Sequence, residues 1–279
     1  MHWLATMEEA LPGRSAELPF AHLFGPLARA AFDELVTTWP DEHVRALSPR
    51  AREGAQAWLL NRLSLVSTRL LTSLLEPGPA SERWRYAGLC RSLAANGLQP
   101  ASSRYPAWAE LVQVQIDGWS MALTELVTRL SQDAELLAEH FPVSVPLRVE
   151  RMRLASTQAR MGGRAAIYLD LAGHGDTVHL LYKPRDPSLE KAFMRVARTV
   201  LWENEALAQL TFVCASPAHG YVNVLQQRFC EVDELPDFYR NAGRLLALMY
   251  GVSADDGHMG NVLACGPFPV PVDTESWLS

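Results

Sequence analysis

The segment "RAAIYLDLAGHGDTVHLLYKPRDPSLEKAF" (Arg164–Phe193) decides the fold of this chain. Two runs of strand-forming residues flank "GHGD", a turn signal of hairpin length, and predict an antiparallel hairpin over residues 164–183. Pro184 and Pro187 end the second strand, and Ser188 is a suitable N-cap for the helix predicted to follow. The segment therefore predicts a strand that ends at Lys183 and leads directly into a helix.

The sequence on either side of this segment divides the chain into three parts. Residues 1–150 are predicted to be helical, because stretches such as "REGAQAWLLNRLSLVSTRLLTSLL" (52–75) carry an apolar stripe at helical spacing. Downstream, "TFVCA" and "YVNVLQQRFC" predict two strands, "ELPDFYRNAGRLLALMYG" a helix, and "NVLACG" with "FPVPVD" a short hairpin. The parts predicted are a helical region (1–150), an N-lobe (151–230) and the start of a C-lobe (231–279). This order of lysine strand, helix, strands and acidic loop is typical of a kinase-like fold.

Composition narrows the class of protein. The chain has 279 residues, a hydrophobic fraction of 48% and a net charge of −6. The acidic balance argues against a nucleic-acid partner. The four cysteines form no Cys-x-x-Cys pair, and neither a secretory signal nor an apolar run long enough for a membrane span is found. We therefore expect a cytoplasmic protein with reduced thiols and no membrane span.

The segment "SADDGHMGNVLACGPFPVPVDTES" (Ser253–Ser276) carries the residues expected to perform chemistry. Phosphoryl transfer needs an acid beside the attacking hydroxyl, oxygen ligands for Mg²⁺ and a strand lysine for the nucleotide phosphates. Asp256 is the candidate base, and Asn261, Asp273 and Glu275 lie where metal ligands are needed. The hairpin between Asn261 and Asp273 would bring these two residues together at its open end. The alternative is a solvated turn with ordinary capping acids.

Further candidates surround this pattern. His258 is either a local orienting or phosphate-contacting group or a structural histidine. Gly162 and Gly163, in "MGGR" before the first strand, either let backbone amides approach phosphate or form a plain turn. Arg185 is either a second phosphate cation beside Lys183 or a surface residue. A kinase-like fold also needs a glutamate to pair with Lys183, and the sequence leaves three candidates open: Glu190, Glu203 and Glu205.

Three stretches, "RYPAWAELV" (104–112), "LLYKPRDPSLEKAF" (180–193) and "FYRNAGRLLALMYGVSADDGHMGNVLACGPFPVPVDTESWL" (238–278), resemble the N-terminal dehydratase domain of class II lanthipeptide (lantibiotic) synthetases. The resemblance implies an α+β fold in which a helical N-terminal block precedes an incomplete lipid-kinase-like core with a small antiparallel sheet. It implies that ATP and Mg²⁺ are used to phosphorylate Ser and Thr of a leader-bearing ribosomal precursor peptide. Elimination of phosphate then leaves dehydroamino acids.

The resemblance also implies roles for individual residues. Lys183 is similar to the nucleotide lysine, and the catalytic loop and the metal-side acids correspond to Asp256, His258, Asn261, Asp273 and Glu275. Family members carry a zinc cyclase domain on the C-terminal side, which would be a partner absent from these 279 residues.

Two departures from the family pattern keep other functions open. Gln158 and Arg160 stand where the family has an acid and a histidine, and the chain ends at Ser279, before the rest of the expected C-lobe. We therefore expect an apparently truncated dehydratase domain, whose isolated chain has weak or no turnover. The alternatives are a catalytically inactive, peptide-binding remnant of the same fold and a small-molecule kinase.

Overall fold

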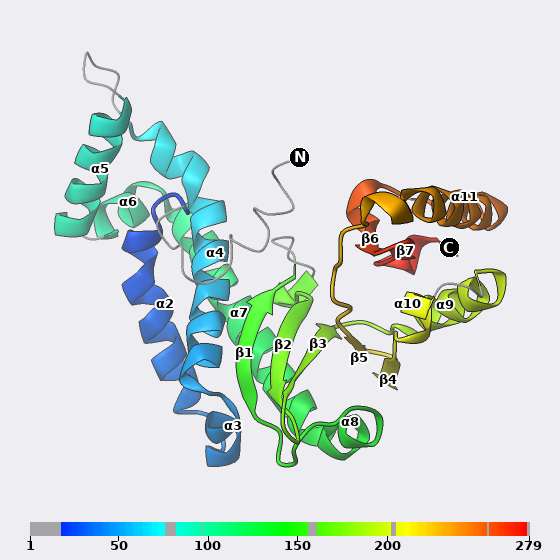
Figure 1. The fold of residues 1–279 in the computed structure, drawn as a ribbon. Coiled ribbons are helices and arrows are strands. Elements are labelled where there is room, and N and C mark those ends of the chain that lie inside the picture. Colours follow the sequence, from blue (N-terminus) through cyan, green and yellow to red (C-terminus); the bar gives the residue numbers. More distant parts are fainter. Residues whose placement is uncertain are drawn as a thin grey trace. The chain divides into compact units, whose positions relative to one another are not determined.

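The structure is a computed structural model, which describes residues 18–75, 82–96, 98–155, 161–201, 205–255 and 257–277. The chain divides into two compact units (Figure 1): unit 1 comprises residues 1–138 and 142–177, and unit 2 comprises residues 139–141 and 178–279. Helices dominate and the strands pair in antiparallel fashion, which confirms the predicted α+β class.

Unit 1 is mainly helical, as the apolar stripes predict. Its elements are α2 (Ala21–Val36), α3 (Asp41–Ala46), α4 (Pro49–Ser73), α5 (Glu82–Asn96), α6 (Gln99–Arg104), α7 (Pro106–Gln132), most of α8 (Ala134–His140), β1 (Val149–Leu154), the 3₁₀ turn η1 (Met161–Gly163) and β2 (Ile167–Ala172). The fully buried Trp119 of α7 donates its Nε1 hydrogen bond to the carbonyl of Ala55 in α4, 3.1 Å away. This bond ties the two longest described helices together.

Strand β1 is absent from the sequence prediction. It pairs in antiparallel fashion with β2, and its buried positions include Val149 and Met152. Its sequence, "VERMRL", alternates too weakly between apolar and charged residues to indicate a strand by pattern alone.

Unit 2 contains most of β3 (Thr177–Lys183), α9 (Ser188–Val200), α10 (Glu205–Ala208), β4 (Phe212–Ser216), β5 (His219–Asn223), α11 (Leu235–Gly251), β6 (Val262–Cys265) and β7 (Phe268–Pro271), with short 3₁₀ turns η2 (Val232–Glu234), η3 (Met259–Asn261) and η4 (Thr274–Ser276). Strand β5 pairs with both β3 and β4, and β6 pairs with β7. These elements confirm the predicted order from the lysine strand to the terminal hairpin.

Two predictions in unit 2 are wrong in detail. The strand predicted to reach Cys230 ends at Asn223, where its ladder with β3 stops at the Leu180–Asn223 pair. The amide of Val224 still donates to the carbonyl of His179, and Arg228 forms an isolated bridge to Cys265 instead of extending the strand. Ser188 is the first residue of α9 rather than its N-cap, since Pro187 holds that position. The amide of Ser188 instead donates to Asp186 Oδ1 at 2.9 Å, so Asp186 supplies the helix with an acceptor at its start.

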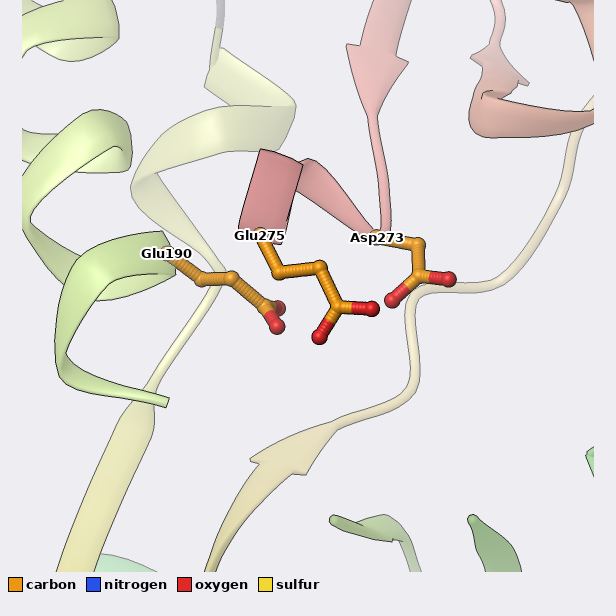
Figure 2. A group of neighbouring side chains, drawn as sticks. All are labelled: Glu190, Asp273 and Glu275. Carbon is orange, nitrogen blue, oxygen red and sulfur yellow. The ribbon is translucent and has the colours of Figure 1, made fainter. Parts of the chain in front are cut away.

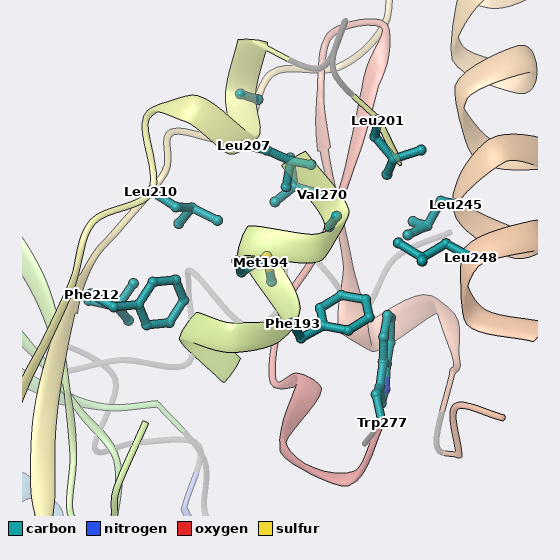
Figure 3. Packing of buried hydrophobic residues seen from close by; sticks show 13 residues of the cluster. Phe193, Met194, Leu201, Leu207, Leu210, Phe212, Leu245, Leu248, Val270 and Trp277 are labelled. Carbon is teal, nitrogen blue, oxygen red and sulfur yellow. The ribbon is translucent and has the colours of Figure 1, made fainter. Parts of the chain in front are cut away.

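The core of unit 2 joins α9, α11 and the terminal hairpin (Figure 3). Phe193 of α9 packs edge-on against Trp277, with ring centroids 5.2 Å apart, and both side chains are fully buried. Val270 of β7 and Leu245 and Leu248 of α11 belong to the same buried cluster. This packing fixes the start of α9 against the end of the terminal hairpin.

No helix among the described residues combines the length and the apolar character that a bilayer span requires.

Candidate active site

A buried ion pair joins the end of β3 to the first turn of α9. The Nζ of Lys183 contacts Glu190 Oε2, and the two side chains are only 5% and 3% exposed. Of the three glutamates that the sequence leaves open as partners, Glu190 therefore makes the pair. Glu205 is exposed on α10, and Glu203 lies outside the described residues.

The geometry of this pair follows from the local sequence. Lys183 lies opposite Gly220 in the ladder between β3 and β5. A Cβ atom at Gly220 would lie 2.4 Å from Cγ of Pro187, so glycine is needed for the turn to pack against the strand. The turn is thus held against the sheet, and Glu190 in the first turn of α9 returns to the strand end.

Arg185 and two acids from the chain's last segment complete the cluster. Figure 2 shows its three acids, Glu190, Asp273 and Glu275. The Arg185 guanidinium contacts Glu190 Oε1 and Asp273 Oδ1, each at 2.7 Å, and also Glu275 Oε2. Lys183 Nζ lies 3.4 Å from Asp273 Oδ1. Carboxylate oxygens of Glu190, Asp273 and Glu275 all lie within 4.8 Å of one another. The structure thus brings together four of the predicted residues and places Arg185 inside the cluster rather than on the surface.

Buried side chains anchor the segment that carries Asp273 and Glu275. Asp273 adopts a left-handed conformation (φ 55°, ψ 47°), which is uncommon for a residue other than glycine. Trp277 follows the 3₁₀ turn η4, and its indole fills the core against Phe193. Burial of Thr274, which lies between the two acids, and of Trp277 therefore holds Asp273 and Glu275 beside Arg185. Sequence reasoning missed this anchor, although "TESWL" places a large aromatic residue directly after the acids.

The terminal hairpin has the register needed to bring Asn261 near the acids. Val262 pairs with Pro271, and the amide of Val272 donates to the carbonyl of Asn261 at 2.8 Å. Asn261 therefore lies opposite the residue that precedes Asp273, and it is buried. The exposed His258 caps η3, its Nδ1 accepting from the amide of Gly260 at 3.0 Å. Asp256, Gln158 and Arg160 lie outside the described residues.

Gly162 and Gly163 belong to unit 1, where they pack against helices. Both have positive φ, and a Cβ atom at Gly163 would lie 2.3 Å from the carbonyl oxygen of Gly118. The Gly163 carbonyl accepts a hydrogen bond from Arg62 at 2.7 Å, and burial lowers the pKa of the Arg62 guanidinium. These contacts give the glycine pair a packing role. Its predicted approach to phosphate stays a prediction.

The donor set fits a hard divalent cation. Three carboxylates of this cluster can each offer an oxygen, which is the ligand type that Mg²⁺ selects. Glu190 Oε1 is a buried atom that has no hydrogen bond among the described residues, since its contact with Arg185 satisfies the distance but not the direction of such a bond. Glu190 Oε1 thus has room for one more positively charged partner beside Asp273 and Glu275, as a bound cation would supply.

Fold and site together define an α+β protein in which a buried lysine–glutamate pair adjoins a group of carboxylates. Residues 105–279 match the family described as "Domain of unknown function (DUF4135)", and the chain belongs to this family. The domain is associated with lanthionine synthetase-like proteins. A search of curated proteins finds no significant match.

Proposed function

We propose that this chain is a dehydration domain of lanthipeptide biosynthesis that acts in the cytoplasm. It would use ATP and Mg²⁺ to phosphorylate Ser and Thr of a leader-bearing precursor peptide, and would then eliminate phosphate to leave dehydroamino acids. Membership of the DUF4135 family supports the broad assignment. The single observation that carries the mechanism is the buried Lys183–Glu190 pair adjoining Asp273, because a kinase-like site needs a lysine held by a glutamate next to a metal-side acid.

Each described residue of the site has a chemical task in this proposal. Glu190 fixes the ammonium of Lys183 at the end of β3, where that charge would hold nucleotide phosphates. Asn261, Asp273 and Glu275 would hold Mg²⁺, which when bound neutralises charge on the phosphates. Their places on one hairpin and its following turn keep these oxygen ligands together.

The two chemical steps need different groups. Asp256 would accept the proton of the attacking Ser or Thr hydroxyl in the first step. In the second step a base removes the α proton, and the phosphate leaves with the electron pair of the broken C–O bond. Lys183 would stabilise the charge of that leaving phosphate.

Mass spectrometry of a co-expressed precursor peptide tests this function. An active protein removes one water (about 18 Da) for each modified Ser or Thr, and Asp256→Asn abolishes that loss. Asp255→Asn is the matched control, because it makes the same charge change at the neighbouring, exposed acid. A peptide that retains phosphate would show that only the elimination step is missing. Dehydration that proceeds without ATP would contradict the mechanism.

A catalytically inactive binding module is the second candidate. It is favoured by the fact that all five charged side chains of the cluster contact an opposite charge within it, as in a structural ion-pair network. Equilibrium dialysis with ATP separates the two candidates. Binding of ATP that requires Mg²⁺ and is lost in Lys183→Met favours the enzyme, whereas absence of binding favours the module.

A further inference from the structure

Arg185 contacts all three acids of the cluster. Its guanidinium reaches Glu190 and Asp273 at 2.7 Å and also contacts Glu275. A guanidinium presents five N–H donors in a planar fork, so one side chain can serve several carboxylates at once. Arg185 is therefore the shared counter-ion of the three acids.

This counter-ion satisfies the acids unequally. Asp273 Oδ1 receives a hydrogen bond from Arg185 at 2.7 Å, but the contact with Glu190 Oε1 lacks hydrogen-bond direction. Among the described residues Glu190 Oε1 has no hydrogen bond, although its side chain is only 3% exposed. A guanidinium that leaves a buried carboxylate oxygen incompletely satisfied is an imperfect occupant of the site.

The side chain of Arg185 is also placed so that it can leave. It is 20% exposed, whereas Lys183 beside it is 5% exposed. Pro184 and Pro187 restrict the backbone on both sides of Arg185. Departure of the guanidinium would therefore be a side-chain rotation toward solvent, with Lys183 and Glu190 left in place.

We propose that Arg185 is a resident counter-cation that a divalent metal ion must displace in order to bind Asp273 and Glu275, next to the unsatisfied Oε1 of Glu190, whose Oε2 continues to hold Lys183. This inference rests on the proposed function, because it assumes that the acids bind Mg²⁺. Metal and guanidinium use the same oxygens and repel each other at this distance, so they exclude one another. Arg185 and Lys183 offset two of the three negative charges when no metal is bound, and competition with Arg185 lowers the metal affinity. By linkage, a ligand that binds more tightly when Arg185 has left the acids strengthens metal binding. The bound metal strengthens the binding of that ligand by the same factor.

Titration of the 279-residue chain with Mn²⁺, followed by electron paramagnetic resonance of the free ion, tests this inference without an activity assay. Arg185→Gln is expected to bind Mn²⁺ at least about tenfold more tightly than the parent chain, since it removes an adjacent positive charge and the competing donor. Arg185→Lys is expected to show an intermediate affinity, because an ammonium cannot serve three carboxylates from one position. Arg240→Gln is the matched control: Arg240 lies on α11 and pairs with the exposed Asp237, so its loss leaves affinity unchanged.

The possible outcomes separate this inference from the proposed function. If the parent chain binds Mn²⁺ and Arg185→Gln binds equally or more weakly, Arg185 organises the site instead of competing for it, and the inference is wrong. If neither the parent nor the variants bind Mn²⁺, the metal-dependent function and the inference fall together. If circular dichroism shows that Arg185→Gln does not fold, Arg185→Lys decides: an affinity no tighter than that of the parent overturns the inference.

Discussion

Removing one member of the buried Lys183–Glu190 pair should destabilise unit 2 far more than removing both. Lys183→Met leaves the Glu190 carboxylate buried, with the imperfectly directed Arg185 contact at 2.7 Å. Glu190→Leu leaves the Lys183 ammonium buried, with Asp273 at 3.4 Å. Breaking a buried pair by removing one partner costs about 3–5 kcal/mol. Since each remaining charge keeps one weaker partner, we expect about 3 kcal/mol for either single substitution.

The double variant Lys183→Met/Glu190→Leu should recover most of this loss. It replaces two buried charges with apolar side chains of similar size, a change that is often neutral or stabilising. We expect a total cost below about 2 kcal/mol, although Arg185 then loses one of its three carboxylates. With about 3 kcal/mol for each single substitution, the coupling energy between the two residues is at least about 4 kcal/mol.

Native-state hydrogen exchange of the β3 and β5 amides measures these energies, because those strands report the opening of unit 2. The pair formed by Asp237 and Arg240 is the control, since its side chains are 57% and 60% exposed. Its single substitutions should change the free energy of unfolding by no more than about 0.5 kcal/mol. Single substitutions at Lys183 and Glu190 that each cost less than about 1 kcal/mol, or that simply add in the double variant, would refute the reasoning.

Three further predictions concern stability. Trp277→Ala removes a fully buried indole packed on Phe193 and should lower the free energy of unfolding by about 3–5 kcal/mol, measured by urea unfolding; a loss below about 1 kcal/mol would mean that the turn carrying Asp273 is anchored in another way. Gly163→Ala should lower the free energy of unfolding by about 2 kcal/mol or more, because φ is +79° and the new methyl group meets the Gly118 carbonyl. Gly88→Ala in α5 has open space around the new methyl group and should raise the free energy of unfolding by up to about 1 kcal/mol. Thermal melting of both variants checks that the two changes have opposite signs. Burial raises the pKa of the Cys90 thiol above its ordinary value of 9.0, so the folded state binds that proton more tightly. This contribution to stability is complete below pH 9.0, the ordinary pKa, and is lost as the pH rises through the higher pKa of the folded state. The parent protein should therefore lose more stability between about pH 8 and about pH 11 than Cys90→Ala does. Equal losses in the two proteins would contradict the assignment.

Local sequence predicts a large part of the fold and of the candidate site. Lys183 at the end of a strand, the helix after the two prolines and the hairpin between Asn261 and Asp273 all depend on short-range signals. Alternation, turn residues and proline act within a few residues of one another, so they can be recognised without the rest of the chain. Strand β1 escapes this kind of analysis because the pairing with β2, rather than the pattern of "VERMRL", makes it a strand.

Local sequence cannot identify which of the three glutamates pairs with Lys183. Glu190 is selected because the turn before α9 packs on Gly220 and directs the first helical turn back to the strand end. Nothing in the spacing of the three candidate glutamates distinguishes them, since burial and direction depend on packing with residues far along the chain.

The sequence by itself determined the order of the elements from β3 to β7 and four of the charged residues that the site uses, namely Lys183, Arg185, Asp273 and Glu275. Only the tertiary structure decided how those charges meet: Lys183 reaches Asp273 across 90 residues of sequence, and Arg185 reaches it across 88. It also decided that Arg185 lies among the acids and that Trp277 anchors their turn. The physical reason is that turns and the periodicity of single helices and strands are specified by near neighbours, whereas desolvation and ion pairing depend on segments that only the packed core brings together.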